Sequence, residues 1–371
     1  MSSNTRALSY KELVERECQQ AINNMLETLP DYCRLFDEKR AGEDIAVRTR
    51  KENLRDITLF FRFIVTLPEF NQYEIKSFPA EQLENITILQ LDSYMSWLKG
   101  TPDNNLSMEV SARKRNLTSV RALFSYLYTR NFINANPILK KELPRVKQKD
   151  PEQIIILEQY MRFPFFKSFD DAIEEADEKL EETMQNKKNV SVRIQMGPAI
   201  AKRDKLIVYL LIGTGIRISE LCGMDINDFS PALNCINITR KGNHVDAVYL
   251  PDYVRTLLDD YIANWRDQFK PSPEHKNAIF LSEQHARITV RTVERMIKKH
   301  ADKTLGANNK ISPHKLRATF ATEYYEQTRD IEGASHAVGH ADISTTAKYY
   351  VRKSKDAKMK ATELDFKIED N

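Results

Sequence analysis

The chain has few cysteines and no long hydrophobic run, which argues against a disulfide-stabilised protein and against a membrane-spanning one. Its four cysteines among 371 residues, Cys18, Cys33, Cys222 and Cys235, form no CxxC pair and have no histidine at metal-ligand spacing. A reduced cytosolic protein without a disulfide framework fits this pattern. No apolar run approaches the roughly 18 residues of a membrane span, and the N-terminus has no apolar signal core. We therefore expect a soluble, cytoplasmic protein with no membrane insertion.

An excess of charge of one sign is also missing. Lysine and arginine number 56 against 53 aspartates and glutamates, a net charge of +3, so no strong overall field attracts nucleic acid. The distribution is uneven, since residues 1–150 carry 23 basic and 20 acidic side chains, residues 151–190 carry 5 and 10, and residues 191–371 carry 28 and 23. An acidic stretch thus separates two mildly basic blocks.

The length predicts two domains. Apolar residues recur at helical spacing in residues 10–29, 48–65 and 108–130, and Thr87 can cap a further helix over Ile88–Leu98. We expect a bundle of four or five helices over 1–138. A linker rich in proline and lysine should follow over 139–152, with a second domain over 153–371.

The second domain should be mainly α with a small antiparallel sheet. Residues 166–189 are predicted to form an acidic amphipathic helix that ends in a polar loop, and the segment 169–190 has no assignable chemistry. Residues 202–224 give a buried helix, a glycine turn and a second helix. Residues 235–251 alternate like two short strands around a basic tip, Lys241–Gly242–Asn243. The fold class is therefore mainly α, in two domains.

Four clusters of the second domain hold its least ordinary polar residues: "GTGIRISEL", "TRKGN", "SPHKLRATFAT" and "GHADISTTAKYY". Arginine forks can bind both non-bridging oxygens of a phosphate. Lysine and histidine can transfer protons, and a tyrosine hydroxyl can act as a nucleophile. Together these are the parts for breaking a phosphodiester covalently. No carboxylate pair accompanies them, which argues against a two-metal nuclease, and we expect no metal and no cofactor.

These clusters resemble the tyrosine recombinase family, also called phage integrases. The family order of arginine, lysine, His-x-x-Arg, histidine and tyrosine is matched by Arg217, Lys241, His314, Arg317, His340 and Tyr349. The likeness is strong over about residues 195–355 and looser before it, where it implies a helical (SAM-like) core-binding domain. Within the family the chain is most similar to Xer-type recombinases that act alone. Ala318 stands where many relatives have histidine, but it is not among the six.

The resemblance implies roles for these residues. Arg217 and Arg317 would clamp the scissile phosphate, and Tyr349 would attack it to give a 3'-phosphotyrosyl bond. Lys241 would protonate the leaving 5'-oxygen. His314 would accept the tyrosine proton or orient the phosphate, His340 would bind a phosphate oxygen, and Glu220 would support the site. On a helix, the Tyr350 side chain would point about 100° away from that of Tyr349, so Tyr350 is expected to pack or to contact the DNA backbone and to serve as a control for Tyr349.

The resemblance also implies partners. We expect a double-stranded DNA site with a short inverted repeat, a homotetramer on two such sites, a Holliday junction intermediate and, as an option, a DNA translocase. A tail helix after the tyrosine, with Leu364 and Phe366, would pack on a neighbouring protomer. The candidate DNA contacts of the first domain are Arg48, Arg50, Lys51, Arg113, Lys114, Arg115 and Arg121.

Three biological roles are open at this point. The first is resolution of chromosome dimers. The second is integration or excision of a phage or conjugative element. Many integrases of such elements carry an extra N-terminal arm-binding domain, which we do not expect here because the predicted bundle begins within about ten residues, although some simple integrases lack it as well. The third, a DNA-binding protein without catalysis, conflicts with the complete set of six residues.

Overall fold

The computed structural model describes residues 7–100, 104–145, 156–186, 190–240 and 244–339. Among them, residues 11–145 form one compact unit, the N-terminal unit, and residues 7–10 with 156–339 form another, the C-terminal unit. Residues 7–10 were expected in the first domain, but the Tyr10 ring lies 5.7 Å from the Arg287 guanidinium of the C-terminal unit. None of the helices in the described ranges is long and apolar enough to cross a membrane.

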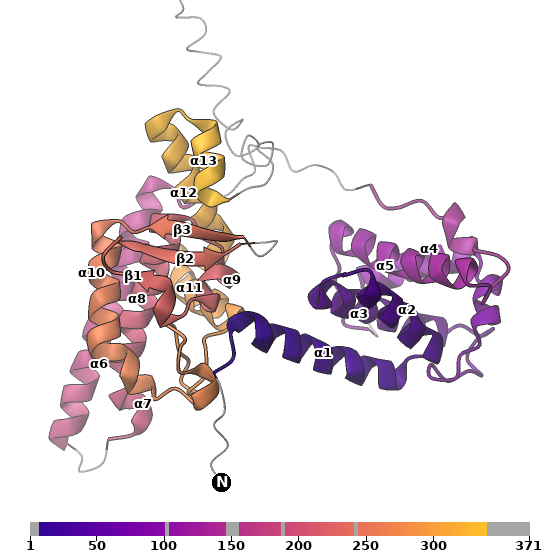
Figure 1. Cartoon of the computed structure of the whole chain (residues 1–371), viewed down its shortest axis with the longest axis horizontal. Coiled ribbons are helices and arrows are strands. Elements are labelled where there is room, and N and C mark those ends of the chain that lie inside the picture. The colour runs from indigo at the N-terminus through magenta and orange to yellow at the C-terminus, as the bar shows by residue number, and fades with distance from the viewer. Residues whose placement is uncertain (1–6, 101–103, 146–155, 187–189, 241–243, 340–371) are drawn as a thin grey trace, which may run out of the picture. The chain divides into compact units, whose positions relative to one another are not determined.

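The N-terminal unit is a helical bundle, in agreement with the sequence prediction (Figure 1). The Thr87 hydroxyl accepts from the Gln90 backbone N–H, and the Gln90 side chain accepts from the Thr87 N–H, so a capping box starts the predicted fourth helix. The elements are α1 (Tyr10–Thr28), α2 (Asp31–Gly42), α3 (Val47–Ile64), η1 (Ala80–Asn85), α4 (Ile88–Lys99), α5 (Val110–Thr129) and η2 (Pro137–Lys140).

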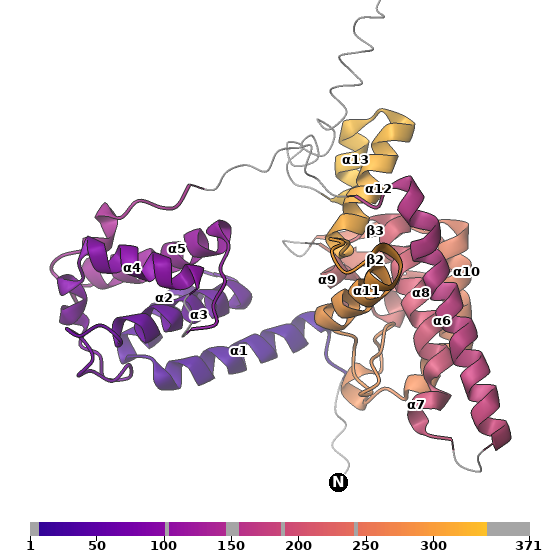
Figure 2. The same ribbon diagram turned by 180° about the vertical axis from the view of Figure 1, so that it is seen from behind.

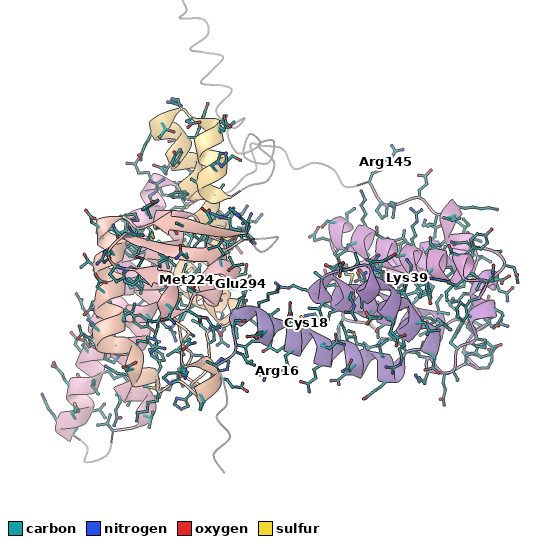
Figure 3. The ribbon with its side chains drawn as sticks, viewed as in Figure 1. Arg16, Cys18, Lys39, Arg145, Met224 and Glu294 are labelled. Atoms are coloured by element: carbon teal, nitrogen blue, oxygen red, sulfur yellow. The ribbon has the colours of Figure 1, made fainter. Side chains whose placement is uncertain are left out.

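Aromatic rings fill the centre of this bundle. Phe60 of α3 meets Phe61, Tyr94 and Phe124 edge to face, with ring centroids 5.4 to 5.7 Å apart. The unit also includes the start of the predicted linker, because Lys141 pairs with Asp92 and Leu143 packs against the core. Arg145, the last residue described before the gap, is exposed and extends away from the helices (Figure 3).

The C-terminal unit is mainly helical with a small sheet, as predicted. Its helices are α6 (Gln159–Asn186), α7 (Val192–Gln195), α8 (Gly197–Thr214), α9 (Ile218–Gly223), α10 (Asp252–Asp260), α11 (Val290–Leu305), α12 (Pro313–Thr328) and α13 (Ile331–Val338), with the short turns η4 (Ile226–Asp228), η5 (Tyr261–Trp265), η6 (Arg266–Phe269) and η7 (Pro273–His275). Helix α6, the predicted acidic helix, lies along α8 and α11 in both views (Figures 1 and 2).

The sheet has three antiparallel strands in the order β1 (Phe229–Ser230), β2 (Cys235–Thr239), β3 (Val245–Tyr249). The predicted hairpin is β2–β3, with Thr239 opposite Val245. Strand β1 was not predicted, since two residues are too short to show an alternating pattern. The hairpin tip, 241–243, lies outside the described residues.

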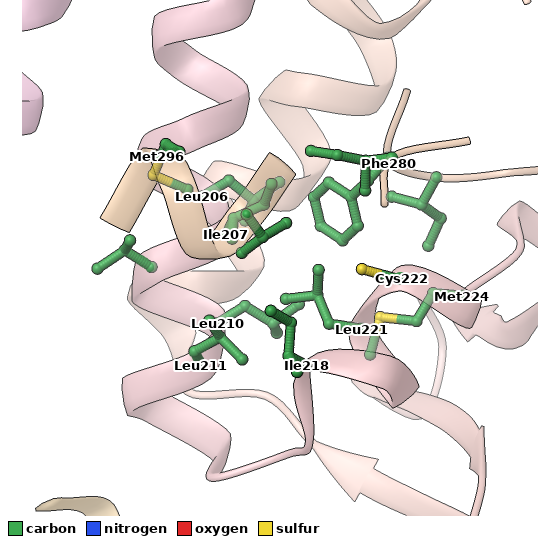
Figure 4. Close-up of a cluster of buried hydrophobic side chains, with 14 of the residues drawn as sticks. Leu206, Ile207, Leu210, Leu211, Ile218, Leu221, Cys222, Met224, Phe280 and Met296 are labelled. Atoms are coloured by element: carbon green, nitrogen blue, oxygen red, sulfur yellow. The ribbon is translucent and has the colours of Figure 1, made fainter. Parts of the chain in front are cut away.

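A hydrophobic core between α8 and α9 anchors the part of the chain that carries Arg217. Figure 4 shows side chains of α8 and α9 packed with Phe280 and Met296. All of them are at least 91% buried, so the end of α8 and the start of α9 are fixed from the inside. The α8 and α9 residues labelled there are Leu206, Ile207, Leu210, Leu211, Ile218, Leu221 and Cys222.

Candidate active site

Arg217 occupies the N-cap of α9, directly after a turn that requires glycine. Gly215 has a φ of +63°, and a Cβ there would lie 2.2 Å from the Phe320 ring, so the turn excludes other residues. The Arg217 backbone N–H donates to Glu220 Oε2 at 2.7 Å, and its Nη1 donates to Glu220 Oε1 at 2.8 Å. Glu220 therefore fixes both the backbone and the side chain of Arg217.

Arg317 reaches the same region from α12. Pro313 takes the first position of that helix, as predicted, and Arg317 is buried one turn later. Its Nη1 donates to the Gly215 carbonyl at 2.5 Å, and its Nη2 donates to the Val338 carbonyl. The side chain thus ties the glycine turn before Arg217 to the end of α13.

A third arginine, Arg240 at the end of β2, joins this group. Its Nε donates to Asp246 Oδ2 of β3 at 2.6 Å, and its Nη1 donates to the Val338 carbonyl at 3.3 Å. The same Nη1 is 3.7 Å from Glu220 Oε2. Sequence reasoning passed over Arg240 because the adjacent Lys241 matched the family pattern, and no periodicity marks an arginine as buried.

The three guanidinium groups meet at the carbonyl end of α13. Arg217 Nη2 donates to the Gly339 carbonyl at 2.8 Å, while Arg240 and Arg317 both donate to the Val338 carbonyl. A helix C-terminus carries a partial negative charge that attracts cations. Carbonyl dipoles do not cancel full charges, however, and among the described residues Glu220 is the carboxylate that contacts two of the three arginines. The site keeps positive charge suited to an anion such as phosphate.

The other predicted site residues divide into two groups. His314 lies at the second position of α12 and is exposed, whereas Arg317, three residues later, is buried. The α12 face that their spacing predicts is therefore exposed to solvent at His314 and buried at Arg317. Lys241, His340 and Tyr349, with Tyr350, Leu364 and Phe366, lie outside the described residues.

Two of the candidate DNA contacts in the N-terminal unit are held in ion pairs. Arg50 forms a two-pronged ion pair with Asp37, whose side chain is 5% exposed. Arg115 donates to Asp56 by two bonds of 3.3 Å, and the Asp56 side chain is 1% exposed. Ser119 also donates to this buried carboxylate, at 2.9 Å. These pairs already satisfy a large part of both guanidinium groups.

The remaining candidates are more open. Arg48 and Lys114 are exposed on α3 and α5, and Lys51 is half-buried beside Glu52 at 3.9 Å. Arg113 and Arg121 are also half-buried, and each has a buried Nε without a hydrogen-bond partner among the residues that the structure describes. Fixed cations with open donors can bind phosphate, and these five side chains retain that ability.

Comparison with known proteins agrees with this geometry. Residues 176–356 match the model of the phage integrase family. The C-terminal unit therefore matches the tyrosine recombinases. A relative of this chain, "Tyrosine recombinase XerS" of Streptococcus mutans, is 24% identical over 352 residues, which cover 89% of this chain and 94% of the relative.

Solved structures share the fold. The XerH site-specific recombinase bound to its difH substrate, in a pre-cleavage complex, has a TM-score of 0.56 at 20% identity, and the match covers 84% of this chain and 78% of the XerH chain. A lambda integrase tetramer bound to a Holliday junction has a TM-score of 0.55 at 14% identity and covers 84% and 77%. The two-part, mainly helical architecture predicted from the sequence is confirmed.

Proposed function

We propose that this protein cuts and rejoins DNA at a specific site through a 3'-phosphotyrosyl intermediate and a Holliday junction. The observation that supports this most is the convergence of Arg217 and Arg317 on one point, from α9 and α12, with backbone carbonyls as their acceptors there. A phosphate can replace a carbonyl as acceptor at little cost, because it brings full negative charge to the same donors.

In this mechanism Arg217 and Arg317 hold the two non-bridging oxygens of the scissile phosphate. They stabilise the charge that builds up when the Tyr349 oxygen adds to phosphorus, and such preorganised donors typically contribute about 3 to 4 kcal/mol each. Glu220 keeps Arg217 in place, since it accepts both the backbone and side-chain donors of that residue.

Proton transfer is assigned to residues beside the clamp. Tyr349 loses its proton to His314, which is exposed at the start of α12, and Lys241 gives a proton to the leaving 5'-oxygen. His340 binds a phosphate oxygen. The phosphotyrosyl bond keeps the energy of the broken phosphodiester, so the 5'-hydroxyl of another strand can reseal the backbone without a metal or other cofactor.

A nicked suicide substrate tests the cleavage step. The short strand beyond the scissile phosphate diffuses away after cleavage, so a covalent protein–DNA adduct accumulates and is seen on a denaturing gel. Tyr349→Phe should form no adduct, and Tyr350→Phe should form it at nearly the normal rate. An adduct with Tyr349→Phe would show that another residue is the nucleophile.

For the partner we propose a short, nearly palindromic duplex bound by four protomers on two DNA copies. The DNA-bound XerH complex and the junction-bound lambda integrase tetramer support this arrangement. Deleting residues 356–371 should leave binding to a single site intact and abolish pairing of two sites in a native gel. Normal junction formation by the truncated chain would contradict a role of the tail in assembly.

For the biological role we propose resolution of chromosome dimers, which the 24% identity to XerS over most of both chains favours. Integration or excision of a mobile element uses the same chemistry and is the alternative. Sequencing the genomic fragments trapped as covalent adducts separates the two. A single site near the replication terminus supports dimer resolution, while sites at the ends of an element support the alternative.

A further inference from the structure

We propose that Arg240 is a positioning residue for DNA cleavage: its guanidinium fixes the end of β2, directly before Lys241, to Asp246, to Glu220 and to the carbonyl end of α13. This inference rests on the proposed function, in which Lys241 donates the proton to the leaving oxygen. Arg240 itself need not touch DNA for this role.

The surroundings of Arg240 are unusual for a residue beside a hairpin tip. Its side chain is only 9% exposed, although strand-end arginines are normally solvated. Burial of a guanidinium is costly unless its donors are satisfied. Here Asp246, Glu220 and the Val338 carbonyl surround it from three elements, so the orientation of the group is fixed on all sides.

The backbone of Arg240 is fixed as well. Its N–H donates to the His244 carbonyl at 2.7 Å, which closes the hairpin immediately before and after residues 241–243. Asp246, on the facing strand, holds the side chain of the same residue. Both the main chain and the side chain of Arg240 therefore determine where the chain leaves β2 toward Lys241.

The α13 side of the contact leaves no space for a larger residue. Gly339 has a φ of +61°, and a Cβ on it would lie 2.4 Å from Arg240 Nη1. The glycine thus serves two purposes, since it allows the left-handed turn at the helix end and lets the guanidinium approach. Gly339 precedes His340, so Arg240 links the chain neighbours of two proposed active-site residues.

Glu220 connects this link to the phosphate clamp. One of its oxygens accepts from Arg217 Nη1, and the other accepts from the Arg217 N–H and is 3.7 Å from Arg240 Nη1. A shift of Arg240 would be expected to disturb proton donation first, because Arg217 keeps both bonds to Glu220 without it. That order of effects separates a positioning role for Lys241 from a general structural role.

A DNA substrate with a 5'-bridging phosphorothiolate shows whether a variant has lost its general acid. In normal cleavage the tyrosine O–P bond forms, the P–O5' bond breaks, and the 5'-oxygen takes a proton from the general acid. When sulfur replaces that oxygen, a thiolate leaves, which is stable near neutral pH without protonation. A variant that lacks a working general acid is therefore slow on the oxygen substrate and fast on the sulfur substrate.

The experiment compares single-turnover adduct formation on nicked substrates with oxygen or sulfur at the bridging position. General acid catalysis contributes about 10² to 10⁴-fold, so we expect Arg240→Ala to slow the oxygen substrate by about 100-fold and the sulfur substrate by less than about 10-fold. Lys241→Ala should show the same selectivity. Asp246→Asn, which removes one partner of Arg240 and changes little else, should show it more weakly and remains informative if Arg240→Ala does not fold.

Two results would overturn the inference. One is a normal rate with the oxygen substrate in both Arg240→Ala and Asp246→Asn. The other is equal slowing of both substrates in a folded variant, which would make Arg240 a structural residue or part of the phosphate clamp. A wild-type chain that forms no adduct with either substrate would instead contradict the proposed function itself.

Discussion

Arginine side chains have different hydrogen-bond partners in the helical bundle and in the candidate active site. In the bundle, Arg50 and Arg115 pair with the buried carboxylates of Asp37 and Asp56. In the site, Arg317 donates to the carbonyls of Gly215 and Val338, while Arg217 divides its donors between Glu220 and the Gly339 carbonyl. A carboxylate neutralises a guanidinium, whereas a carbonyl only orients it. The described contacts of these arginines are therefore with carboxylates in the bundle, and with backbone carbonyls as well as Glu220 in the site.

The largest expected effect comes from removing an arginine of the candidate active site. Arg217→Ala should slow adduct formation on the suicide substrate by about 100- to 1000-fold, because one of the two phosphate donors is lost. Because the variant also takes a partner from the buried Glu220 carboxylate, its unfolding free energy is measured alongside, and the adduct rate is compared at a temperature where the variant is folded. Arg50→Ala is the matched control from the bundle, and there adduct formation per bound complex should stay within about threefold. Equal slowing of adduct formation by Arg217→Ala and Arg50→Ala would contradict a catalytic role that is specific to the arginine of the site.

The next largest effect is expected from removing a buried carboxylate that pairs with an arginine of the bundle. Asp56→Ala should lower the unfolding free energy of the N-terminal unit by about 3 kcal/mol, since Arg115, Asn116 and Ser119 all lose a buried acceptor. Urea denaturation followed by Trp97 fluorescence in a Trp265→Phe background measures it.

Arg115→Ala is the companion to that variant. The Arg115 side chain is 51% exposed, so its loss should cost less than about 1 kcal/mol. The pair of values tests whether the energy lies in the buried acceptor or in the ion pair. Similar losses in Asp56→Ala and Arg115→Ala would point to the ion pair.

A buried histidine should make the C-terminal unit sensitive to acid. His300 stacks on Phe169 at 3.8 Å and contacts the Ser168 hydroxyl at 2.9 Å. Burial, assisted by Lys299 and Lys303, lowers its pKa to about 4 from an ordinary 6.5. Between these values the unfolded chain binds the extra proton, so falling pH favours unfolding.

The expected size of that loss is about 3 kcal/mol between pH 6.5 and 4. Unfolding followed by Trp265 fluorescence in a Trp97→Phe background, at several pH values, measures it. His300→Gln keeps a polar group of similar size beside Ser168 but does not titrate, so its stability should depend less on pH by this amount. An unchanged pH dependence in His300→Gln would assign the acid sensitivity to other groups.

The smallest effect is on the salt dependence of DNA binding. Lys114→Ala should reduce the slope of log K against log salt by about 0.9 if the exposed ammonium contacts a phosphate. Arg50→Ala should leave the slope unchanged, because that guanidinium is occupied by Asp37. Fluorescence anisotropy with a labelled duplex from 50 to 300 mM salt measures both. A slope lowered by Arg50→Ala would show that the ion pair opens on DNA.

Local signals predicted a large part of this molecule. Thr87 and Gln90 are close in sequence, so their capping box was visible in the pattern, as was Pro313 at the start of α12. The glycine turn before Arg217 was equally clear. Features that depend on distant partners were harder to predict: the short strand β1 was missed, and the contacts of Lys141 and Leu143 with the bundle leave no signal in the sequence.

The sequence by itself determined the resemblance to the tyrosine recombinases, the mainly helical two-part fold and the residue types of the site, because these follow from periodicity and from motifs within a few residues. Only the tertiary structure decided which partners each arginine meets. Arg50 and Arg240 look alike as letters in basic stretches, yet one meets Asp37 and the other meets Asp246, Glu220 and a helix end. The partners of these arginines lie up to about a hundred residues away in the sequence, so the pattern of neighbouring residues does not predict them.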